Sequence, residues 1–192
     1  MIKQKKSSPE IICATSSDYS ERAAAVIKEG GIIAYPTETY YGLGCDPFNI
    51  KTVERLFHLK RRPLAKPIIV IIDNPSQLCH LTSKFPEPYR ELVRDHWPGP
   101  LTLIFPAREH LSNLLTGNTG TVGVRMSSRE IAAEICKSAG FPISATSANI
   151  SGQPPASSVE DVVHYFGDQL DLIVDGGVAA ASQCSTIVAI DH

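Results

Sequence analysis

Long hydrophobic runs are absent from this 192-residue sequence. No apolar stretch approaches the ~18 residues that a membrane helix needs, and the basic N-terminus is not followed by the apolar segment of a secretory signal. A chain of this length buries roughly 70% of its unfolded surface as a single domain. We therefore expect a cytoplasmic protein without membrane contact, with a mobile tail at residues 1–9 and a single domain over residues 10–192.

Close cysteine pairs and metal-binding patterns are absent as well. Neighbouring cysteines lie at least 32 residues apart, which is the spacing of Cys13 and Cys45, whereas zinc and redox motifs use closely spaced pairs. The six histidines form neither HxH nor HExxH, and HExxH is a typical metal-binding spacing. The sequence therefore predicts reduced, mostly buried thiols, no catalytic cysteine and no metal site built from protein side chains.

Common motifs for nucleotide binding and for nucleophilic serine are missing too. Neither GxxxxGK[ST] nor GxGxxG occurs in the chain, and no GxSxG marks a serine nucleophile. If the protein binds a nucleotide, side-chain cations and the amides of turns must hold it.

The charge of the chain is nearly balanced but unevenly distributed. A net charge of −2 does not indicate a general nucleic-acid-binding protein. Between Lys51 and Lys66, however, six cations accompany a single anion, Glu54. A basic island on an otherwise acidic protein indicates that one face meets an anion.

Hydrophobic periodicity and turn residues predict strands alternating with helices. Helices are expected over residues 18–29, 46–60, 86–97, 128–140 and 159–167, and strands over residues 32–36, 67–72, 101–107, 121–126, 141–145, 170–175 and 185–190. The residues at Asp18, Ser127 and Ser157 are each followed by Glu at the third position, as in a capping box. In the second helix, Lys51, Arg55 and Lys60 are expected on the solvent side or at the helix end.

This alternation is typical of a three-layer α/β fold, with helices on both faces of a sheet. The strands at residues 101–107 and 121–126 have no predicted helix between them, so they resemble hairpin neighbours. We therefore expect a mixed sheet within one domain.

Four polar segments follow predicted strands or helices. The first, YPTETYYGLG at residues 35–44, places Thr37, Glu38 and Thr39 where open α/β sheets often present ligands. An alternative is a plain connecting loop. The second, LKRRPLAKP at residues 59–67, has cations that could complement the helix dipole. Because Lys66 lies beyond that helix end and two prolines stiffen the segment, an anion-binding segment is favoured.

The third segment is ATSANISG at residues 145–152, in which small residues surround Ser147, Asn149 and Ser151. Such a turn allows a ligand to approach the backbone closely, although a plain Asx or Ser turn is the alternative. The fourth is Arg125 at the end of an apolar strand. A charge there is usually paired or faces a ligand, because burying it unpaired is costly.

Together these segments resemble the YrdC-like family of L-threonylcarbamoyladenylate synthases, in its bacterial single-domain form. The resemblance rests on YPTETYYGLGCD, LKRRPLAKP, WPGPLT, VGVRM, TSANISG and STIVAI, in the family's order and over residues 20–190. It implies a twisted mixed sheet flanked by helices around a basic groove. It also implies synthesis of threonylcarbamoyl-AMP and pyrophosphate from L-threonine, bicarbonate and ATP, for tRNA modification next to the anticodon.

The resemblance also implies roles for single residues. Lys60 and Arg62 would hold the ATP phosphates and carry catalysis, Ser147, Asn149 and Ser157 would contact the nucleotide, and Thr37, Arg125 and Ser185 would bind threonine. Magnesium would arrive with ATP, and threonylcarbamoyl transferase proteins would be partners. In many relatives an arginine segment follows the last strand. This sequence ends at His192, so either ATP is bound without that arginine or another part of the chain replaces it.

Two other functions remain open from the sequence. One is a related protein of the same fold that binds or hydrolyses nucleotides without making the adenylate. The other is a module that binds double-stranded RNA in the basic groove, and RNA binding could also accompany catalysis. The intact triplet Ser147-x-Asn149 argues against the first alternative, because divergent relatives are expected to lose it.

Overall fold

The computed structural model describes residues 9–179 and 185–190. The tail expected at residues 1–9 lies outside the described residues except for Pro9. The strands are β1 Glu10–Cys13, β2 Ile33–Pro36, β3 Tyr41–Gly44, β4 Ile69–Ile72, β5 Leu101–Pro106, β6 Thr121–Met126, β7 Ile143–Ser147, β8 Leu172–Asp175 and β9 Thr186–Val188. The α-helices are α1 Tyr19–Lys28, α2 Ile50–Lys60, α3 Tyr89–His96, α4 Asn113–Thr116, α5 Glu130–Ala139 and α6 Val159–Phe166. Two 3-10 turns, Pro75–His80 and Gly167–Gln169, complete the set.

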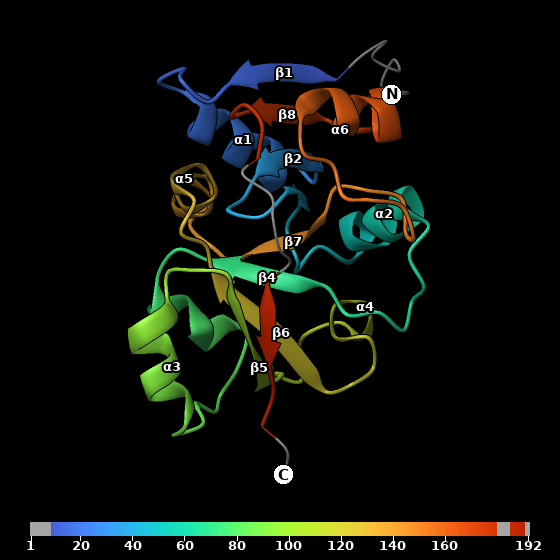
Figure 1. The fold of residues 1–192 in the computed structure, drawn as a ribbon. Coiled ribbons are helices and arrows are strands. Elements are labelled where there is room, and N and C mark those ends of the chain that lie inside the picture. The colour runs from blue at the N-terminus through green and yellow to red at the C-terminus, as the bar shows by residue number, and fades with distance from the viewer. Residues whose placement is uncertain (1–8, 180–184, 191–192) are drawn as a thin grey trace.

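In the described residues the strands form one sheet in the order β1-β8-β2-β3-β7-β4-β6-β5-β9 (Figure 1). The pairs β1–β8, β2–β8, β4–β6 and β5–β9 are parallel, and the other four are antiparallel. The predicted mixed sheet is therefore confirmed. The strands β5 and β6 pair antiparallel, as expected for hairpin neighbours.

Helices cover both faces of the sheet, as the three-layer prediction requires (Figure 1). Alternate residues of one strand point to opposite sides. In β4, Ile71 packs in the cluster formed by α1 and α5, whereas Val70 and Ile72 pack in the cluster that includes α2, α3 and α6. Because both faces are buried, this strand is a continuous apolar run rather than an alternating one.

Several local expectations were wrong. The alternative of a plain connecting loop at residues 35–44 is wrong, because these residues form the β2–β3 hairpin with its turn at residues 37–40. The strand β1 was not predicted. The short helix α4 lies between β5 and β6, where no helix was expected. The elements β1, β3 and α4 are each four residues long, too short to show a period.

The predicted capping boxes are also corrected. The side chain of Asp18 makes no cap hydrogen bond and accepts one from the Ser16 hydroxyl instead. The N-cap of α5 is Arg129, not Ser127. The N-cap of α6 is Ser158, whose hydroxyl accepts from the Asp161 amide at 3.3 Å.

The cysteine prediction holds in part. The four described cysteines are free. Cys45 and Cys136 are buried, and burial raises the pKa of each thiol to about 12. Cys13 and Cys79 are exposed, so the thiols are not mostly buried. In the described part of the chain, no helix is long and apolar enough to cross a membrane.

The cationic segment at residues 61–67 rests against the end of α4. The amide of Ile68 donates to the Leu115 carbonyl at 3.0 Å. Gly117 ends the helix in a left-handed conformation with φ +59°. A Cβ at this position would lie 2.8 Å from the Ala65 carbonyl oxygen and 2.9 Å from the Pro67 nitrogen. The absence of a side chain at Gly117 therefore lets this segment sit close to α4.

We predict that Gly117→Ala lowers the free energy of unfolding by about 2–4 kcal/mol, because it adds a backbone clash to the cost of a left-handed alanine. The matched control is Gly120→Ala, which has φ +68° but nothing within 4 Å of the added Cβ. The control should cost only about 1–2 kcal/mol. Urea unfolding of both variants measures the difference, and equal losses would show that the close approach is unimportant.

Candidate active site

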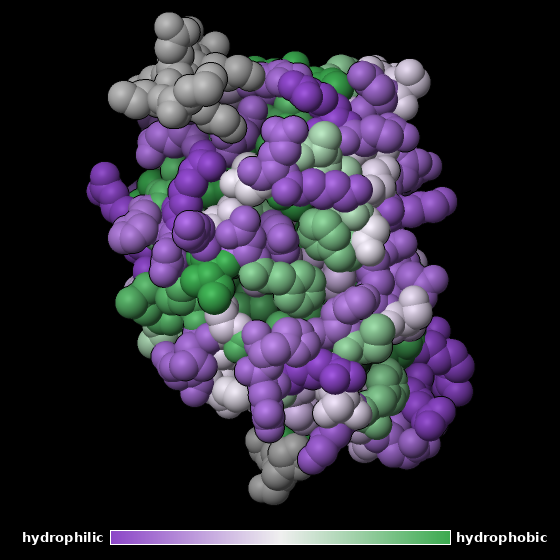
Figure 2. Space-filling model, turned by 180° about the vertical axis from the view of Figure 1, so that it is seen from behind, coloured by the Kyte–Doolittle hydropathy of each residue, from purple (hydrophilic) through white to green (hydrophobic). Residues whose placement is uncertain are grey.

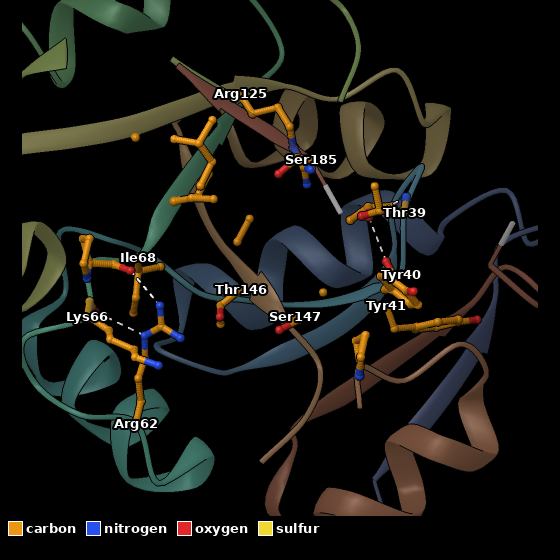
Figure 3. A pocket seen from close by; sticks show the side chains of 18 of the residues that line it. Thr39, Tyr40, Tyr41, Arg62, Lys66, Ile68, Arg125, Thr146, Ser147 and Ser185 are labelled. Carbon is orange, nitrogen blue, oxygen red and sulfur yellow. Dashed lines mark hydrogen bonds between the residues drawn. The ribbon is translucent and has the colours of Figure 1, made fainter. Parts of the chain in front are cut away.

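A cavity of about 490 Å³ lies where the β2–β3 hairpin, the segment at residues 61–67, β6, β7 and the start of β9 meet (Figure 3). Its size suits a nucleotide-sized or drug-sized ligand. Polar side chains occupy separate ends of it: Arg62 and Lys66 at one, Arg125 and Ser185 at the other, with Thr146 and Ser147 between them.

The basic end of the cavity is built on the chain that leaves α2. Arg61 ends the helix at φ 49°, a left-handed conformation, and its side chain is exposed and does not line the cavity. The next residue, Arg62, turns inward. Its Nε and Nη2 donate to the carbonyls of Lys66 (3.2 Å) and Pro67 (2.8 Å), and burial lowers the pKa of its guanidinium. Backbone carbonyls thus fix one edge of a guanidinium at the cavity.

The other end contains a nearly buried ion pair. Arg125 in β6 places Nη1 3.3 Å from Oε1 of Glu38, and the two side chains are only 7% and 13% exposed. The hydroxyl of Ser127 donates to the second oxygen of the same carboxylate. The Nε of Arg125 is buried without a hydrogen-bond partner. A guanidinium in this state can still bind an anionic group of a ligand.

The hairpin turn beside this pair is held by its own hydrogen bonds. The hydroxyl of Thr37 donates to the Tyr40 carbonyl at 2.8 Å and accepts from the Thr39 amide at 3.2 Å. Thr37 and Thr39 both line the cavity. The turn therefore presents two hydroxyl side chains in a fixed backbone conformation.

The turn at Ser147–Asn149 begins at the last residue of β7 and is held by the side chain of Lys60. The Ser147 hydroxyl donates to Asn149 Oδ1 at 2.7 Å, and Asn149 Nδ2 donates to the Gln153 carbonyl. The ammonium of Lys60 donates to the carbonyls of Ser147 and Asn149 and to Asn149 Oδ1. All three of its donors are therefore used by one turn.

Lys60 is the last residue of α2, as expected for a position at the helix end, but it does not lie on the solvent side, since the residue is 1% exposed. Burial and then the charge of Arg62 lower its pKa to about 7. The carbonyls of the turn offset the cost of removing this ammonium from water. Whether Lys60 also meets phosphate stays a prediction.

Five of the eight predicted site residues line the cavity, and three do not. Those that line it are Thr37, Arg62, Arg125, Ser147 and Ser185, and those that do not are Lys60, Asn149 and Ser157. The backbone amide and hydroxyl of Ser157 both donate to the Asp161 carboxylate at 2.9 Å. The N-cap of α6 is Ser158 and not the predicted Ser157. A contact between Ser157 and a nucleotide stays a prediction.

The sequence did not reveal the apolar floor of the cavity, to which Ile69, Ile104, Gly123 and Ala145 contribute. One signal was available, because a glycine inside a strand often marks close approach of another group. A Cβ at Gly123 would lie 3.2 Å from Ile104 and 3.3 Å from Thr102. Glycine here keeps the floor open.

A magnesium ion fits this cavity only as a companion of a bound phosphate. The described lining residues include hydroxyl groups but no carboxylate. Among the residues described, no group of three or more His, Cys, Asp or Glu side chains could hold a metal ion. Magnesium bound to nucleotide phosphates commonly keeps several waters and few protein ligands, which suits this donor set.

Comparison with known proteins places these residues in a wider context. The family model Sua5/YciO/YrdC, described as "Telomere recombination", matches residues 25–192. The chain is 42% identical over 174 residues to the threonylcarbamoyl-AMP synthase of Idiomarina loihiensis, covering 90% of this chain and 93% of that protein. It is 41% identical over 172 residues to the Pseudomonas aeruginosa protein of the same name, covering 90% of this chain and 92% of that one.

A solved structure extends this similarity to three dimensions. The chain matches Pyrococcus abyssi Sua5 complexed with L-threonine at a TM-score of 0.89 and 37% identity. The match covers 94% of this chain and 54% of the archaeal one, so the chain spans about half the length of that relative.

We predict that Lys60→Met destabilises the protein even though methionine keeps the apolar stem. Two carbonyls and one amide oxygen lose their donor, and we expect a loss of about 3 kcal/mol. In a domain of this length this lowers the melting temperature by roughly 6–12 °C. The control Lys66→Met, at an exposed cavity residue, should leave the melting temperature unchanged. Equal melting temperatures for the two variants would show that the buried ammonium is not needed for stability.

Proposed function

The chain belongs to the Sua5/YciO/YrdC family, and from this premise we propose that it is an L-threonylcarbamoyladenylate synthase. The reaction joins L-threonine, bicarbonate and ATP to give threonylcarbamoyl-AMP, pyrophosphate and water. The observation that carries the proposal is the division of one cavity between a basic end at Arg62 and Lys66 and an arginine–hydroxyl end at Arg125 and Ser185. Two substrates of different chemistry can therefore meet in it.

The substrates themselves provide the nucleophiles. The amine of threonine attacks the carbon of bicarbonate with loss of water, or that of CO₂ with loss of a proton, and an oxygen of the resulting carbamate attacks the α-phosphorus of ATP. The bond from the α-phosphorus to the bridging oxygen breaks, and pyrophosphate leaves. The protein needs no covalent residue for these steps. Its work is to position the reactants and to neutralise phosphoryl charge.

The residues of the basic end suit the nucleotide. Arg62 offers a planar guanidinium that matches phosphate oxygens, and Lys66 adds a point charge. Ser147, the last residue of β7, lines the same cavity as these cations, and its hydroxyl donates to the side-chain oxygen of Asn149. Magnesium would accompany ATP, bound by phosphates and water, and would neutralise charge on the leaving pyrophosphate.

The residues of the other end suit the amino acid. Arg125 would bind the carboxylate of threonine, with Thr37 and Ser185 contacting its polar groups. The Pyrococcus abyssi structure whose fold this chain shares contains L-threonine, which supports the assignment. The half-enclosed cavity would also shield the labile carbamate from water.

The wider biological context extends the same proposal. The product would pass to a threonylcarbamoyl transferase that modifies tRNA beside the anticodon, in the cytoplasm. The exposed cations Lys51, Arg61 and Lys66, of which Lys66 lines the cavity, would favour contact with RNA. The face shown in Figure 2 is mostly hydrophilic, with a hydrophobic patch near its middle.

We predict that pyrophosphate release from ATP requires both L-threonine and bicarbonate. A coupled phosphate assay, in which each substrate is omitted in turn, measures this dependence. Release that is equally fast without threonine would identify a nucleotide hydrolase instead. No release under any of these conditions, with RNA affinity that falls steeply as salt rises, would favour an RNA-binding module.

We predict that Arg62→Ala weakens ATP use ten- to a hundredfold, the effect of losing roughly 1.5–3 kcal/mol from a charge-assisted contact. The matched control is Arg61→Gly, since glycine accepts the left-handed conformation at that position and the exposed side chain does not line the cavity. The control should keep turnover within about a factor of two. Steady-state kinetics at varied ATP provides the measurement, and similar losses in both variants would place the phosphates elsewhere.

A further inference from the structure

Glu38 is the charged side chain of the hairpin turn, and it does not face the cavity. Its two neighbours, Thr37 and Thr39, line the cavity, whereas Glu38 itself does not. The carboxylate turns instead toward β6, where it meets Arg125 and Ser127. The turn thus presents its hydroxyl groups to a ligand and its carboxylate to the protein.

This contact connects distant parts of the sheet. Glu38 follows β2, and Arg125 belongs to β6, with β3, β7 and β4 lying between these strands in the sheet. The ion pair is therefore not a neighbour contact within one strand pair. It links the hairpin turn to the strand that carries the arginine of the opposite wall.

The carboxylate is also part of a chain of hydrogen bonds that returns to the hairpin. Ser127 donates to Glu38 and accepts from the Arg129 amide at 3.2 Å. The Nη2 of Arg129 donates to the Gly176 carbonyl at 3.1 Å. The Gly176 amide in turn donates to the hydroxyl of Tyr41, in β3, at 3.3 Å. The Glu38 carboxylate is therefore held by Arg125 and, through Ser127, by a series of contacts that ends at Tyr41 of the same hairpin.

We propose that Glu38 is a positioning residue for the amino acid substrate. It fixes the guanidinium of Arg125 and the backbone of the hairpin turn in the arrangement that receives L-threonine. The inference rests on the proposed function, because it takes Arg125 as the partner of the substrate carboxylate. A buried arginine without its counter-charge is expected to turn toward other acceptors or toward water, since an unpaired buried charge is costly.

The geometry favours this role over that of a general base. A base must lie within hydrogen-bond reach of the proton that it removes. The Glu38 carboxylate is not among the described cavity-lining residues, and its oxygens meet Arg125 and the Ser127 hydroxyl. It acts on the substrate through Arg125.

The test is Glu38→Gln, which keeps the size of the side chain and an acceptor for Ser127 but removes the charge. We expect KM for L-threonine to rise about tenfold, corresponding to the loss of one charge-assisted contact. The KM for ATP and kcat at saturating threonine should stay near the wild-type values. Calorimetric titration of L-threonine into each protein gives a second, turnover-free measurement.

The matched control is Asp171→Asn, which removes the carboxylate charge from the Arg55–Asp171 pair (2.8 Å). This pair lies outside the cavity lining, so the control should lose stability without a change in KM for threonine. If Glu38→Gln does not fold, Ser127→Ala leaves the Glu38–Arg125 pair in place but removes the hydroxyl that donates to Glu38 and accepts from the Arg129 amide. This variant should raise KM for threonine by a smaller factor.

Three results in folded Glu38→Gln would overturn the inference. The first is a KM for threonine that is unchanged or lower, and the second is an equal rise in KM for threonine and for ATP. The third is a loss of kcat at unchanged KM for threonine, as expected if Glu38 were a general base. These results are separable from failure of the proposed function. If the proposed function itself is wrong, the wild-type protein will show neither threonine-dependent pyrophosphate release nor threonine binding by calorimetry.

Discussion

The burial of one ammonium group, that of Lys60, determines how the cavity is built. Removing a charge from water is costly unless polar partners replace the solvent. The partners are carbonyl and amide oxygens of Ser147 and Asn149, and the Ser151 amide in turn donates to the Lys60 carbonyl at 2.9 Å. The end of α2 and the turn after β7 therefore form one unit.

The position of Arg62 follows from this arrangement. Because Lys60 points inward, the chain leaves α2 through a left-handed residue at Arg61, and the Arg62 amide donates to the Phe57 carbonyl at 2.9 Å. This reversal directs Arg62 to the cavity while Arg61 remains in solvent. At the opposite wall, Glu38 and Arg125 make the comparable contact between distant strands. Each end of the cavity thus depends on one buried charge.

The sequence predicted the elements whose signals are local. The apolar run that became β4 and the periodic helices α1, α2, α3, α5 and α6 were found, because their patterns extend over enough residues. The strand β3 was missed because YGLG is short and rich in glycine, and β1 was missed because its partner β8 lies far along the chain. Burial of Lys60 could not be predicted, since its partners are 87 and 89 positions away. Cavity residues such as Arg125 were found because a charge ending an apolar strand is itself a local signal.

The strand order has a consequence for how the protein is made on the ribosome. The strand β8 inserts between β1 and β2, and β9 adds to β5 at the far edge. The edges of β2 and β5 that face β8 and β9 therefore stay unpaired until residues 172–188 leave the exit tunnel. Ser185, beside β9, also completes the cavity wall. Such non-local pairing is slow and leaves strand edges exposed to aggregation. A nascent chain of this protein therefore lacks a finished binding cavity until β8, Ser185 and β9 have been made.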